Sequence, residues 1–361
     1  MGKLEEYFLK AYEVAESGRG KTSPNPFAGA LIVKDNAIVG RGHTQSWGND
    51  HAEIQAIKAA GKEAAGATMY VTLEPCCFQG RTPACTEAII NAGISRVVIG
   101  IIDPNPRVNG KGISALEEAG IEVKHGYMEK EIRQQLEYYL TWIEKQRPFV
   151  ILKTAMTLDG FIAGADGNSK WITGAEARKR VHGLRQEVDA IITGIGTILA
   201  DDPQLNCRLE GNESQPLRII IDRDLRIPNE SRIVTSAKSQ KTIVFCSEGC
   251  EPQKMEQLQK AGIQLEVRER EAISPQTILS YLYELHLNCV IVEAGNRLSS
   301  AFIRADMVDK YFIFIAPSLL GNGLKAFSLT ENDNLSQRKK LRFDTIQYYG
   351  DDCLVIAYPQ R

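Results

Sequence analysis

The sequence lacks the features that mark membrane-bound and nucleic-acid-binding proteins. No apolar run approaches the ~18–20 residues that a membrane-spanning helix needs. The formal net charge is −2, with 43 Lys and Arg residues against 45 Asp and Glu residues, so the composition offers no basic surface for nucleic acid. Residues 1–18 carry acidic side chains with an amphipathic period, unlike a signal peptide. These absences predict a cytoplasmic protein with neither a membrane nor a nucleic-acid partner.

The chain also has no internal repeat, no low-complexity segment and no Gly-x-Gly-x-x-Gly motif after a predicted strand. A Rossmann nucleotide site is therefore not supported, and residues 194–196 (GIG) are too short a signal to change that. The length of 361 residues favours two domains, and a hydrophobic content of 43% is that of a globular protein.

Eight cysteines are scattered along the chain, and only Cys76 and Cys85 have the context of a metal site. In a cytoplasmic protein, metal binding or core filling is a commoner use of cysteine than a disulfide. Among the others, we expect five to pack as small hydrophobic side chains: Cys207, Cys246, Cys250, Cys289 and Cys353.

Residues 51–53 (HAE) and 75–85 (PCCFQGRTPAC) contain the parts of a zinc-dependent deaminase. A catalytic zinc takes three nitrogen or sulfur ligands and keeps one position for water, which the metal makes acidic. His51, Cys76 and Cys85 provide such ligands. Glu53 remains free to move protons between the water and the departing amine. The simplest alternative is a satisfied histidine near two buried free cysteines.

The first part of the chain alternates strand and helix patterns, which predicts an α/β layer structure with a parallel part and an antiparallel hairpin. We expect Thr82 to cap a helix over residues 82–91, with Pro83 in its first turn. A single helix over residues 129–145 should close this part. Arg147-Pro148 then breaks the pattern, so we place domains at residues 1–146 and 147–361. The second domain is also predicted to be α/β.

Three segments closely resemble the deaminase half of the bifunctional riboflavin-biosynthesis deaminase–reductases: residues 22–30 (TSPNPFAGA), 51–53 (HAE) and 70–76 (YVTLEPC). The wide spacing between the two cysteines and residues 103–106 (DPNP) are typical of that family as well. The resemblance implies a cytidine-deaminase-like fold.

The resemblance also implies roles for particular residues. Zinc would be held by His51, Cys76 and Cys85, with Glu53 as the proton shuttle. Asn25 would help to hold the pyrimidine, since an amide offers both a donor and an acceptor; the alternative is a turn residue between two prolines. The chain departs from the family at Ala28, Thr44 and Phe78, where Val, His and His are usual. None of these changes removes a metal ligand, and all concern substrate contacts.

The second part resembles the reductase half of the same family, which has a dihydrofolate-reductase-like fold and uses NADPH. The resemblance rests on residues 153–160 (KTAMTLDG), 169–173 (SKWIT), 196–205 (GTILADDPQL) and 292–295 (VEAG). It implies a ribose-phosphate substrate lined by Ser169, Arg185, Leu205, Arg208 and Glu293. It implies NADPH contacts from Ala155, Trp171, Thr197, Asp201 and a turn made of Gly295, Asn296, Arg297, Leu298, Ser299, Ser300 and Ala301.

Several of these assignments have alternatives. Arg185 and Arg208 match phosphate oxygens well, although a lone arginine is commonly a solvated surface residue. Arg223 stands where the family has a small hydroxyl residue, and it would either reach the 2′-phosphate of NADPH or point to water. The turn after Glu293 would expose backbone amides to a phosphate, or be a plain connection between a strand and a helix.

Together these features predict a bifunctional enzyme that takes phosphorylated pyrimidine substrates and assembles as a homo-oligomer. It would deaminate 2,5-diamino-6-ribosylamino-4(3H)-pyrimidinone 5′-phosphate and then reduce 5-amino-6-(5-phosphoribosylamino)uracil to the ribityl compound. One competing interpretation is a nucleoside or tRNA deaminase fused to an unrelated domain. Another is a zinc-binding module in which the metal only supports folding, which would normally use four protein ligands.

Overall fold

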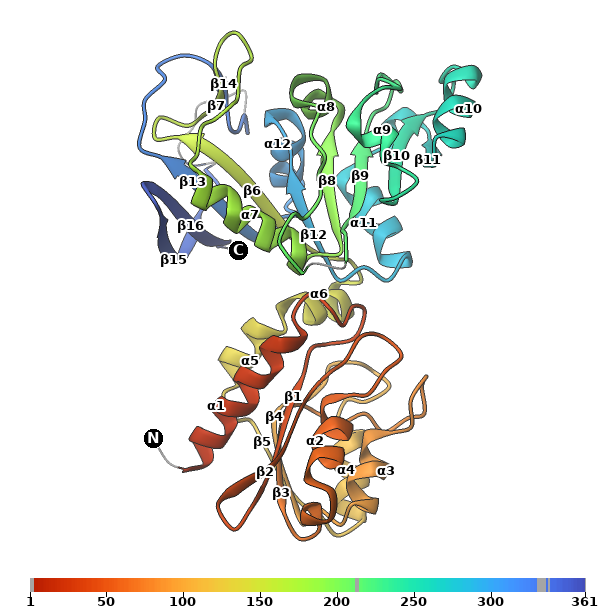
Figure 1. Ribbon diagram of the computed structural model, residues 1–361, viewed down its shortest axis with the longest axis vertical. Coiled ribbons are helices and arrows are strands. Elements are labelled where there is room, and N and C mark those ends of the chain that lie inside the picture. Colours follow the sequence, from red (N-terminus) through yellow and green to blue (C-terminus); the bar gives the residue numbers. More distant parts are fainter. Residues whose placement is uncertain (1–2, 212–213, 330–335, 337, 361) are drawn as a thin grey trace. The chain divides into compact units, whose positions relative to one another are not determined.

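The computed structural model describes residues 3–211, 214–329, 336 and 338–360. The chain divides into two compact units, residues 1–147 and 148–361. Each unit is an α/β layer structure with its own apolar core, as the alternation of strand and helix patterns predicted. Figure 1 draws the first unit in red to yellow and the second in yellow-green to blue. In the described residues no helix has the length and apolar character needed to span a membrane.

The elements of the N-terminal unit in chain order are α1 (Lys3–Ala15), the 3-10 helix η1 (Glu16–Gly18), β1 (Gly29–Lys34), β2 (Ala37–His43), α2 (Ala52–Ala60), η2 (Gly61–Ala64), β3 (Thr68–Leu73), α3 (Cys85–Asn91), β4 (Arg96–Ile101), α4 (Lys111–Glu118), β5 (Glu122–His125), α5 (Glu129–Gln135) and α6 (Glu137–Lys145).

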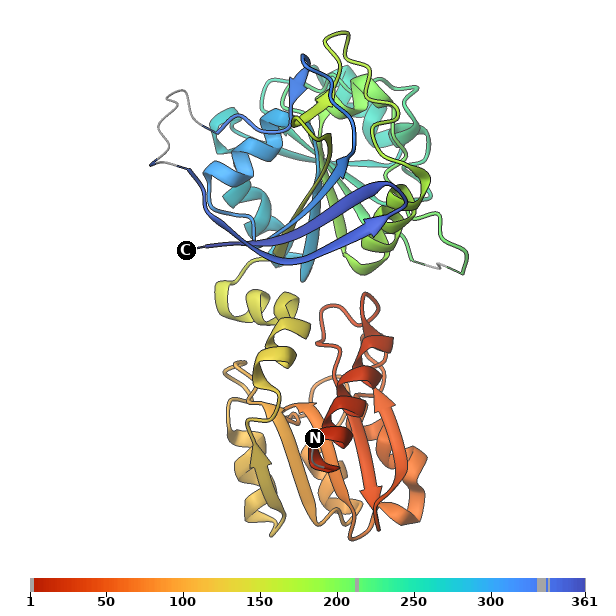
Figure 2. The same ribbon diagram turned by 90° about the vertical axis from the view of Figure 1, so that its left-hand side faces the viewer.

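A five-stranded sheet in the order β2-β1-β3-β4-β5 forms the centre of this unit. β1 is antiparallel to β2 and β3, whereas β3, β4 and β5 are parallel, so the predicted hairpin and parallel part are both confirmed. α1 and α5 cover one face of the sheet, and α2, α3 and α4 lie on the other (Figures 1 and 2). β3 and β4 are buried almost throughout because helices cover both faces, which explains their near-continuous apolar sequences.

Two glycines in β2 allow α2 to approach the sheet more closely than a side chain would permit. A Cβ atom added to Gly42 would lie 2.2 Å from the carbonyl oxygen of Ala52, and one added to Gly40 would lie 2.3 Å from that of Ala56. Both distances are far inside the ~3.5–4.0 Å of ordinary carbon contacts. The backbone of α2 therefore rests directly on β2, and this contact fixes the height of its first turn above the sheet.

Two helix predictions for this unit were wrong in detail. α3 begins at Cys85 rather than near Thr82, because Ala84 before it is extended and the Cys85 N–H is directed to Cys76 Sγ at 3.4 Å. The single helix expected over residues 129–145 is two helices, α5 and α6, separated at Leu136, whose φ of −94° and ψ of 15° are not helical.

The elements of the C-terminal unit in chain order are β6 (Phe149–Thr157), β7 (Phe161–Ala163), α7 (Ala175–Glu187), β8 (Ala190–Gly194), α8 (Ile195–Asp201), β9 (Leu217–Ile221), α9 (Arg232–Thr235), β10 (Thr242–Ser247), α10 (Pro252–Lys260), β11 (Ile263–Arg268), η3 (Arg270–Ala272), α11 (Pro275–Glu284), β12 (Cys289–Glu293), α12 (Asn296–Arg304), β13 (Lys310–Ala316), β14 (Leu324–Lys325), β15 (Leu341–Tyr349) and β16 (Asp352–Pro359).

A nine-stranded sheet in the order β11-β10-β9-β8-β12-β6-β13-β16-β15 forms the centre of the C-terminal unit. The strands from β11 to β13 are parallel, and β16 and β15 continue the sheet as an antiparallel hairpin. Buried residues of α11 and α12 join the strands in one core, and α7 lies on the opposite face (Figures 1 and 2). β12 lies between β8 and β6, so their carboxyl ends meet at one edge of the sheet.

The segment from Gly295 to Ala301 differs from its predicted form. Gly295 is extended and precedes α12, which was expected to begin at Leu298 and begins at Asn296, so the turn is two residues shorter than predicted. α8 is one of the elements that the sequence patterns did not indicate. α8 follows β8 without an intervening loop, which hid its start inside the apolar run of the strand.

Candidate active sites

Three predicted metal ligands come together in the N-terminal unit from three different elements. His51 is the extended residue before α2, Cys76 follows the end of β3, and Cys85 is the first residue of α3. His51 Nδ1 lies 3.6 Å from Cys76 Sγ and 3.3 Å from Cys85 Sγ, and all three ligand atoms lie within 4.8 Å of one another. The structure thus brings together side chains that are 34 residues apart in the sequence.

These distances fit a tetrahedral zinc site. Zinc binds histidine nitrogen at about 2.0 Å and cysteine sulfur at about 2.3 Å, so tetrahedral nitrogen and sulfur ligands lie about 3.6 Å apart. In the described residues this cluster has three protein ligands rather than the four of a structural zinc site. The donor set and its spacing therefore fit a catalytic ion with one position left for water.

The side chains of the cluster shift one another's pKa values. A hydrogen bond from Cys85, and further ones from His51 and the backbone, lower the pKa of Cys76 to about 4. The hydrogen bond with Cys76 and the charge of Glu53 raise the pKa of His51 to about 9. Glu53 lies in the first turn of α2 and is 5% exposed, and its burial raises the pKa of its carboxyl group. The lowered pKa of Cys76 and the raised pKa of His51 thus place a thiolate beside a protonated imidazole where the three ligand atoms meet.

A pocket of about 430 Å³ opens beside His51 and Cys76. This volume is within the range of small-molecule sites. Asn25 lines the pocket, as does Phe78, one of the three departures from the family pattern. The other two departures are buried outside it: Thr44 Oγ1 accepts the Ala28 N–H at 3.0 Å. Of the three, Phe78 is therefore the one in position to change substrate contacts.

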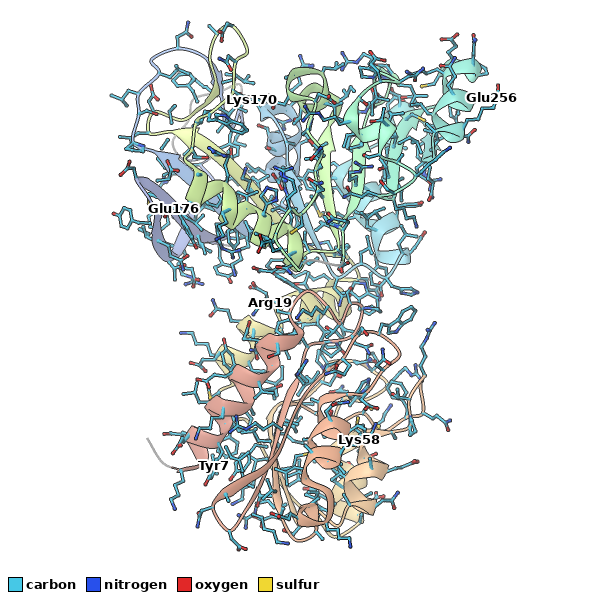
Figure 3. All side chains as sticks on the ribbon, viewed as in Figure 1. Tyr7, Arg19, Lys58, Lys170, Glu176 and Glu256 are labelled. Atoms are coloured by element: carbon cyan, nitrogen blue, oxygen red, sulfur yellow. The ribbon has the colours of Figure 1, made fainter. Side chains whose placement is uncertain are left out.

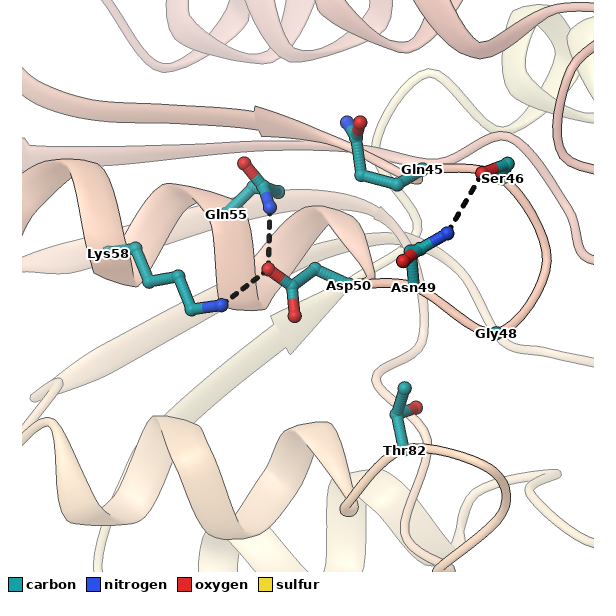
Figure 4. A pocket seen from close by; sticks show the side chains of 8 residues that line it. All are labelled: Gln45, Ser46, Gly48, Asn49, Asp50, Gln55, Lys58 and Thr82. Atoms are coloured by element: carbon teal, nitrogen blue, oxygen red, sulfur yellow. Dashed lines mark hydrogen bonds and ion pairs between the residues drawn. The ribbon is translucent and has the colours of Figure 1, made fainter.

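A second, polar pocket lies next to this site and is lined by the loop before α2 and by α2 itself (Figure 4). Asp50 Oδ2 accepts hydrogen bonds from Lys58 Nζ at 2.5 Å and from Gln55 Nε2 at 2.6 Å (Figure 4). Asp50 directly precedes His51, so these bonds tie the approach to the ligand to the body of the helix.

Glu74 is a buried residue at this site that the sequence did not point out. Its carboxylate accepts four backbone N–H groups, from Asp103 at 3.2 Å, Gly110 at 3.0 Å, Gly112 at 2.9 Å and Ile113 at 3.2 Å. It stands two residues before Cys76, so it joins the ligand segment to the loop between β4 and α4. The only signal in the sequence is a glutamate at the end of an apolar strand.

In the C-terminal unit, an ion-pair network surrounds Glu293 at the carboxyl end of β12. Arg185 Nε and Nη2 bind the two oxygens of its carboxylate at 2.7 and 2.9 Å, and Lys153 Nζ lies 3.8 Å from it. Burial alone would raise the pKa of Glu293, but the charge of Arg185 lowers it to about 2. Burial lowers the pKa of Lys153, which the sequence showed as a lone lysine in an apolar strand. These two cations and one carboxylate leave a net positive charge at this edge of the sheet.

Leu205 and Arg208 lie on a loop that is hydrogen-bonded to Arg185 of the ion-pair network. Arg185 Nη1 donates to the Asn206 carbonyl oxygen at 3.0 Å, and Arg208 Nη1 donates to Asn206 Oδ1 at 2.8 Å. The fully buried Arg218 donates to the Gln204 carbonyl oxygen at 3.3 Å and so fixes the base of the loop. Leu205 has a φ of 49° and is itself buried.

Two predicted site residues on separate segments, Ser169 and Asp201, are hydrogen-bonded to each other, and Asp201 is the last residue of α8. Ser169 Oγ donates to Asp201 Oδ1 at 2.7 Å, and Lys170 Nζ, labelled in Figure 3, donates to the Asp201 carbonyl oxygen at 3.0 Å. Trp171 is 71% exposed, with the Arg178 guanidinium 4.4 Å from its ring centroid. A large exposed ring beside this cluster offers a surface to a planar ligand.

The remaining predicted cofactor residues lie near the carboxyl ends of β6, β8 and β12. Ala155 is in β6, Thr197 is in α8 directly after β8, and α12 follows β12. Asn296 Nδ2 is bound to the Lys325 carbonyl oxygen and Ser328 Oγ. Arg223 stands apart, because it donates to the Ile273 carbonyl oxygen at 2.6 Å. Arg223 therefore contacts the backbone through one nitrogen and is otherwise exposed to solvent.

Two family sequence models match the chain in this order. The cytidine and deoxycytidylate deaminase zinc-binding region matches residues 1–101, and the RibD C-terminal domain matches residues 148–355. With the folds and sites described above, these matches define a two-domain enzyme, a zinc-dependent deaminase followed by an NADPH-dependent reductase.

The relatives cover both domains together. The riboflavin biosynthesis protein RibD of Aquifex aeolicus is 40% identical over 97% of each chain. The structure of Acinetobacter baumannii RibD, form 1, has a TM-score of 0.91 at 36% identity over 99% of each chain. A Thermotoga maritima structure, described as a diaminohydroxyphosphoribosylaminopyrimidine deaminase/5-amino-6-(5-phosphoribosylamino)uracil reductase, has a TM-score of 0.88 at 37% identity over 99% of each chain.

The chain belongs to the RibD family of riboflavin biosynthesis proteins. It is a bifunctional enzyme with a deaminase domain and a reductase domain. The predicted fold class, the two activities and the two cofactors, zinc and NADPH, are thereby confirmed. The alternative of a deaminase fused to an unrelated domain is excluded.

Proposed function

We propose that the N-terminal domain deaminates 2,5-diamino-6-ribosylamino-4(3H)-pyrimidinone 5′-phosphate, using the cluster of His51, Cys76 and Cys85 with Glu53 beside it. The observation that carries this proposal is the tetrahedral spacing of the three ligand atoms at the wall of a ligand-sized pocket. The substrate follows from the description of the Thermotoga maritima relative.

In this site His51 would hold zinc through Nδ1, and Cys76 and Cys85 would hold it as thiolates. When bound, zinc supplies a Lewis acid that makes a water acidic near neutral pH. The Glu53 carboxylate takes a proton from the attacking water and delivers it to the departing amine, the role of the free glutamate in zinc deaminases. Asn25, in the wall of the same pocket, holds the edge of the pyrimidine through its amide.

For the C-terminal domain we propose reduction of 5-amino-6-(5-phosphoribosylamino)uracil by NADPH at the edge of the sheet where β6, β8 and β12 end. Ligands commonly bind at such edges in open parallel sheets. Ser169, Arg185, Leu205, Arg208 and Glu293 would line the substrate. NADPH would contact Ala155, Trp171, Thr197, Asp201 and residues 295–301. Arg223 would take the 2′-phosphate with the N–H groups that do not bind Ile273. Catalysis here would rest on positioning and electrostatics rather than on one general acid.

We further propose that the enzyme acts in the cytoplasm as a homo-oligomer. All eight cysteines are free in the structure, which suits a reducing compartment. Sedimentation of the purified enzyme at several concentrations would test the assembly; a monomer at all of them would contradict it.

The function is tested by supplying each domain with its own substrate. Purified protein should contain about one zinc per chain, release ammonia from the diaminopyrimidine phosphate, and oxidise NADPH only when given the deaminated compound. Ammonia release without zinc dependence would overturn the metal assignment. NADPH oxidation with the diamino compound as the preferred substrate would overturn the order of the two steps.

A further inference from the structure

Two arginines in the pocket beside the metal ligands are each held against an aromatic ring. The Arg81 guanidinium carbon lies 3.7 Å from the ring centroid of Trp47, and that of Arg107 lies 3.7 Å from the ring centroid of Phe78. All four residues line the pocket that also contains His51 and Cys76. Such stacking restricts a guanidinium to one plane while leaving its N–H groups available at the edge.

Neither guanidinium has a protein partner elsewhere in the described part of the chain. Arg81 and Arg107 form no ion pair there, and the hydrogen bonds of Arg107 among the described residues involve only its backbone. The residues that line the pocket include no aspartate or glutamate. The wall of the pocket therefore contains two positive guanidinium groups whose N–H donors are available to a ligand.

The backbone that carries Arg107 is held in place by hydrogen bonds. Its N–H donates to Asn105 Oδ1 at 3.1 Å, and its carbonyl oxygen accepts from Cys77 Sγ at 3.6 Å. Asp103, at the start of the same loop, accepts the Tyr139 hydroxyl at 2.9 Å. Glu74 binds both ends of the loop through the N–H groups of Asp103 and Gly110. The charge of Arg107 is thus anchored to the segment that bears Cys76.

We propose that Arg81 and Arg107 bind the phosphate group of the deaminase substrate, and that Trp47 and Phe78 position them for it. This inference rests on the proposed function of the N-terminal domain. Guanidinium groups match phosphate oxygens in geometry and charge, and two of them suit a dianionic ester better than one. Phe78, where histidine is usual, then acts as the platform for Arg107.

The proposal is tested with Arg81→Gln, Arg107→Gln and the double variant, compared on the phosphorylated substrate and on its dephosphorylated form. Each single change should raise KM for the phosphorylated substrate about tenfold with little change in kcat, since a charge-assisted hydrogen bond is lost. KM for the dephosphorylated form should change less than about twofold. Arg96→Gln is the matched control, because Arg96 is an exposed arginine paired with Glu122 at the start of β4.

Ionic strength gives a second kinetic measurement that a packing role would not affect. Salt screens charge attraction, so KM of the wild type for the phosphorylated substrate should rise with salt, and the double variant should lose that dependence. Equal losses for the two substrates, or no loss for either, would overturn the proposal and make the arginines part of the pocket wall only.

A binding measurement separates failure of this inference from failure of the proposed function. Trp47 fluorescence, isolated by comparison with Trp47→Phe, reports on ligands at the pocket whether or not ammonia is released. The phosphorylated pyrimidine should bind more tightly than its dephosphorylated form to the wild type, and with no preference to the double variant. An unchanged preference in the double variant would overturn the phosphate site even in an active enzyme.

Discussion

The two domains organise their sites in opposite ways. In the N-terminal domain the metal ligands come from short, contiguous motifs at the starts of two helices and the end of one strand. In the C-terminal domain the proposed residues are spread from Ala155 to Ala301 and converge only because β6, β12 and β8 are neighbours in the sheet. The first site would hold an ion, whereas the second has an ion pair of its own, Arg185 with Glu293. The difference predicts that single changes will disable the first site chemically and the second through its stability.

The largest effect is expected from Cys85→Ser. Losing one of three ligands should remove most of the zinc and all measurable deamination, while NADPH oxidation with the deaminated compound continues. Elemental analysis and the two separate assays check this. Full zinc retention would show that Cys85 is not a ligand, and loss of both activities would show that the domains are not independent.

Glu53→Gln should keep the zinc and lower the rate of deamination by about 10²–10⁴-fold, because the amide keeps the shape of the carboxyl group but cannot carry a proton. Zinc content and ammonia release are measured on the same sample. Near-normal ammonia release would assign the proton transfer to another group.

Arg185→Met tests the ion pair of the C-terminal domain. The substitution leaves the carboxylate of Glu293 buried without its bidentate partner. Breaking a buried ion pair in this way typically lowers the free energy of unfolding by about 3–5 kcal/mol, so the C-terminal domain should unfold at a lower temperature. Zinc content and deamination should be unchanged. Calorimetry with both assays checks this, and an unaltered unfolding temperature would show that Lys153 alone satisfies Glu293.

The ion pair of Arg185 with Glu293 also predicts that the stability of the C-terminal domain depends on pH. The pKa of Glu293 is lowered to about 2 from an ordinary value of 4.5. Its contribution to stability is therefore present above about pH 4.5 and is lost as the pH falls towards 2. The wild type should show this acid loss in the C-terminal domain, and Glu293→Gln should not.

The smallest effect is expected from Arg208→Ala, which should raise KM of the reductase for its phosphorylated substrate about ten- to a hundredfold, through loss of a hydrogen bond to phosphate. A dephosphorylated substrate should be nearly unaffected. Arg268→Ala on β11 is the control, since that arginine is paired with Glu266. Equal losses for both substrates would assign Arg208 a structural role in its loop.

The sequence was most informative where chemistry requires particular residues at a fixed spacing. The cluster of His51, Cys76 and Cys85 could be predicted because few other residues bind zinc. The hairpin and the parallel strands followed from the alternation of apolar patterns. Glu74 could not be found in this way, because its four acceptor bonds depend on how a loop about 30 residues later folds back.

Where local signals competed, the sequence misled. Thr82 and Pro83 are typical of a helix start, yet α3 begins at Cys85 because the bond from Cys85 to Cys76 outweighs the local capping signal. The positions of Lys153 and Arg218 depend on partners at least 14 residues away in the chain, such as Glu293 and Gln204. Their charge alone would have placed them at the surface.

Gly42 is neither a proposed zinc ligand nor a proposed substrate contact, yet the placement of His51 and Glu53 depends on it. The space above its α-carbon is filled by the carbonyl oxygen of Ala52, the residue between His51 and Glu53. A methyl group added to Gly42 would push the start of α2 away from the sheet and displace His51 and Glu53 together. An allele with alanine at this position would therefore resemble an active-site lesion in the cell. Riboflavin synthesis would stop at deamination, with an intact reductase left without substrate and no altered residue at the metal to explain the deficiency.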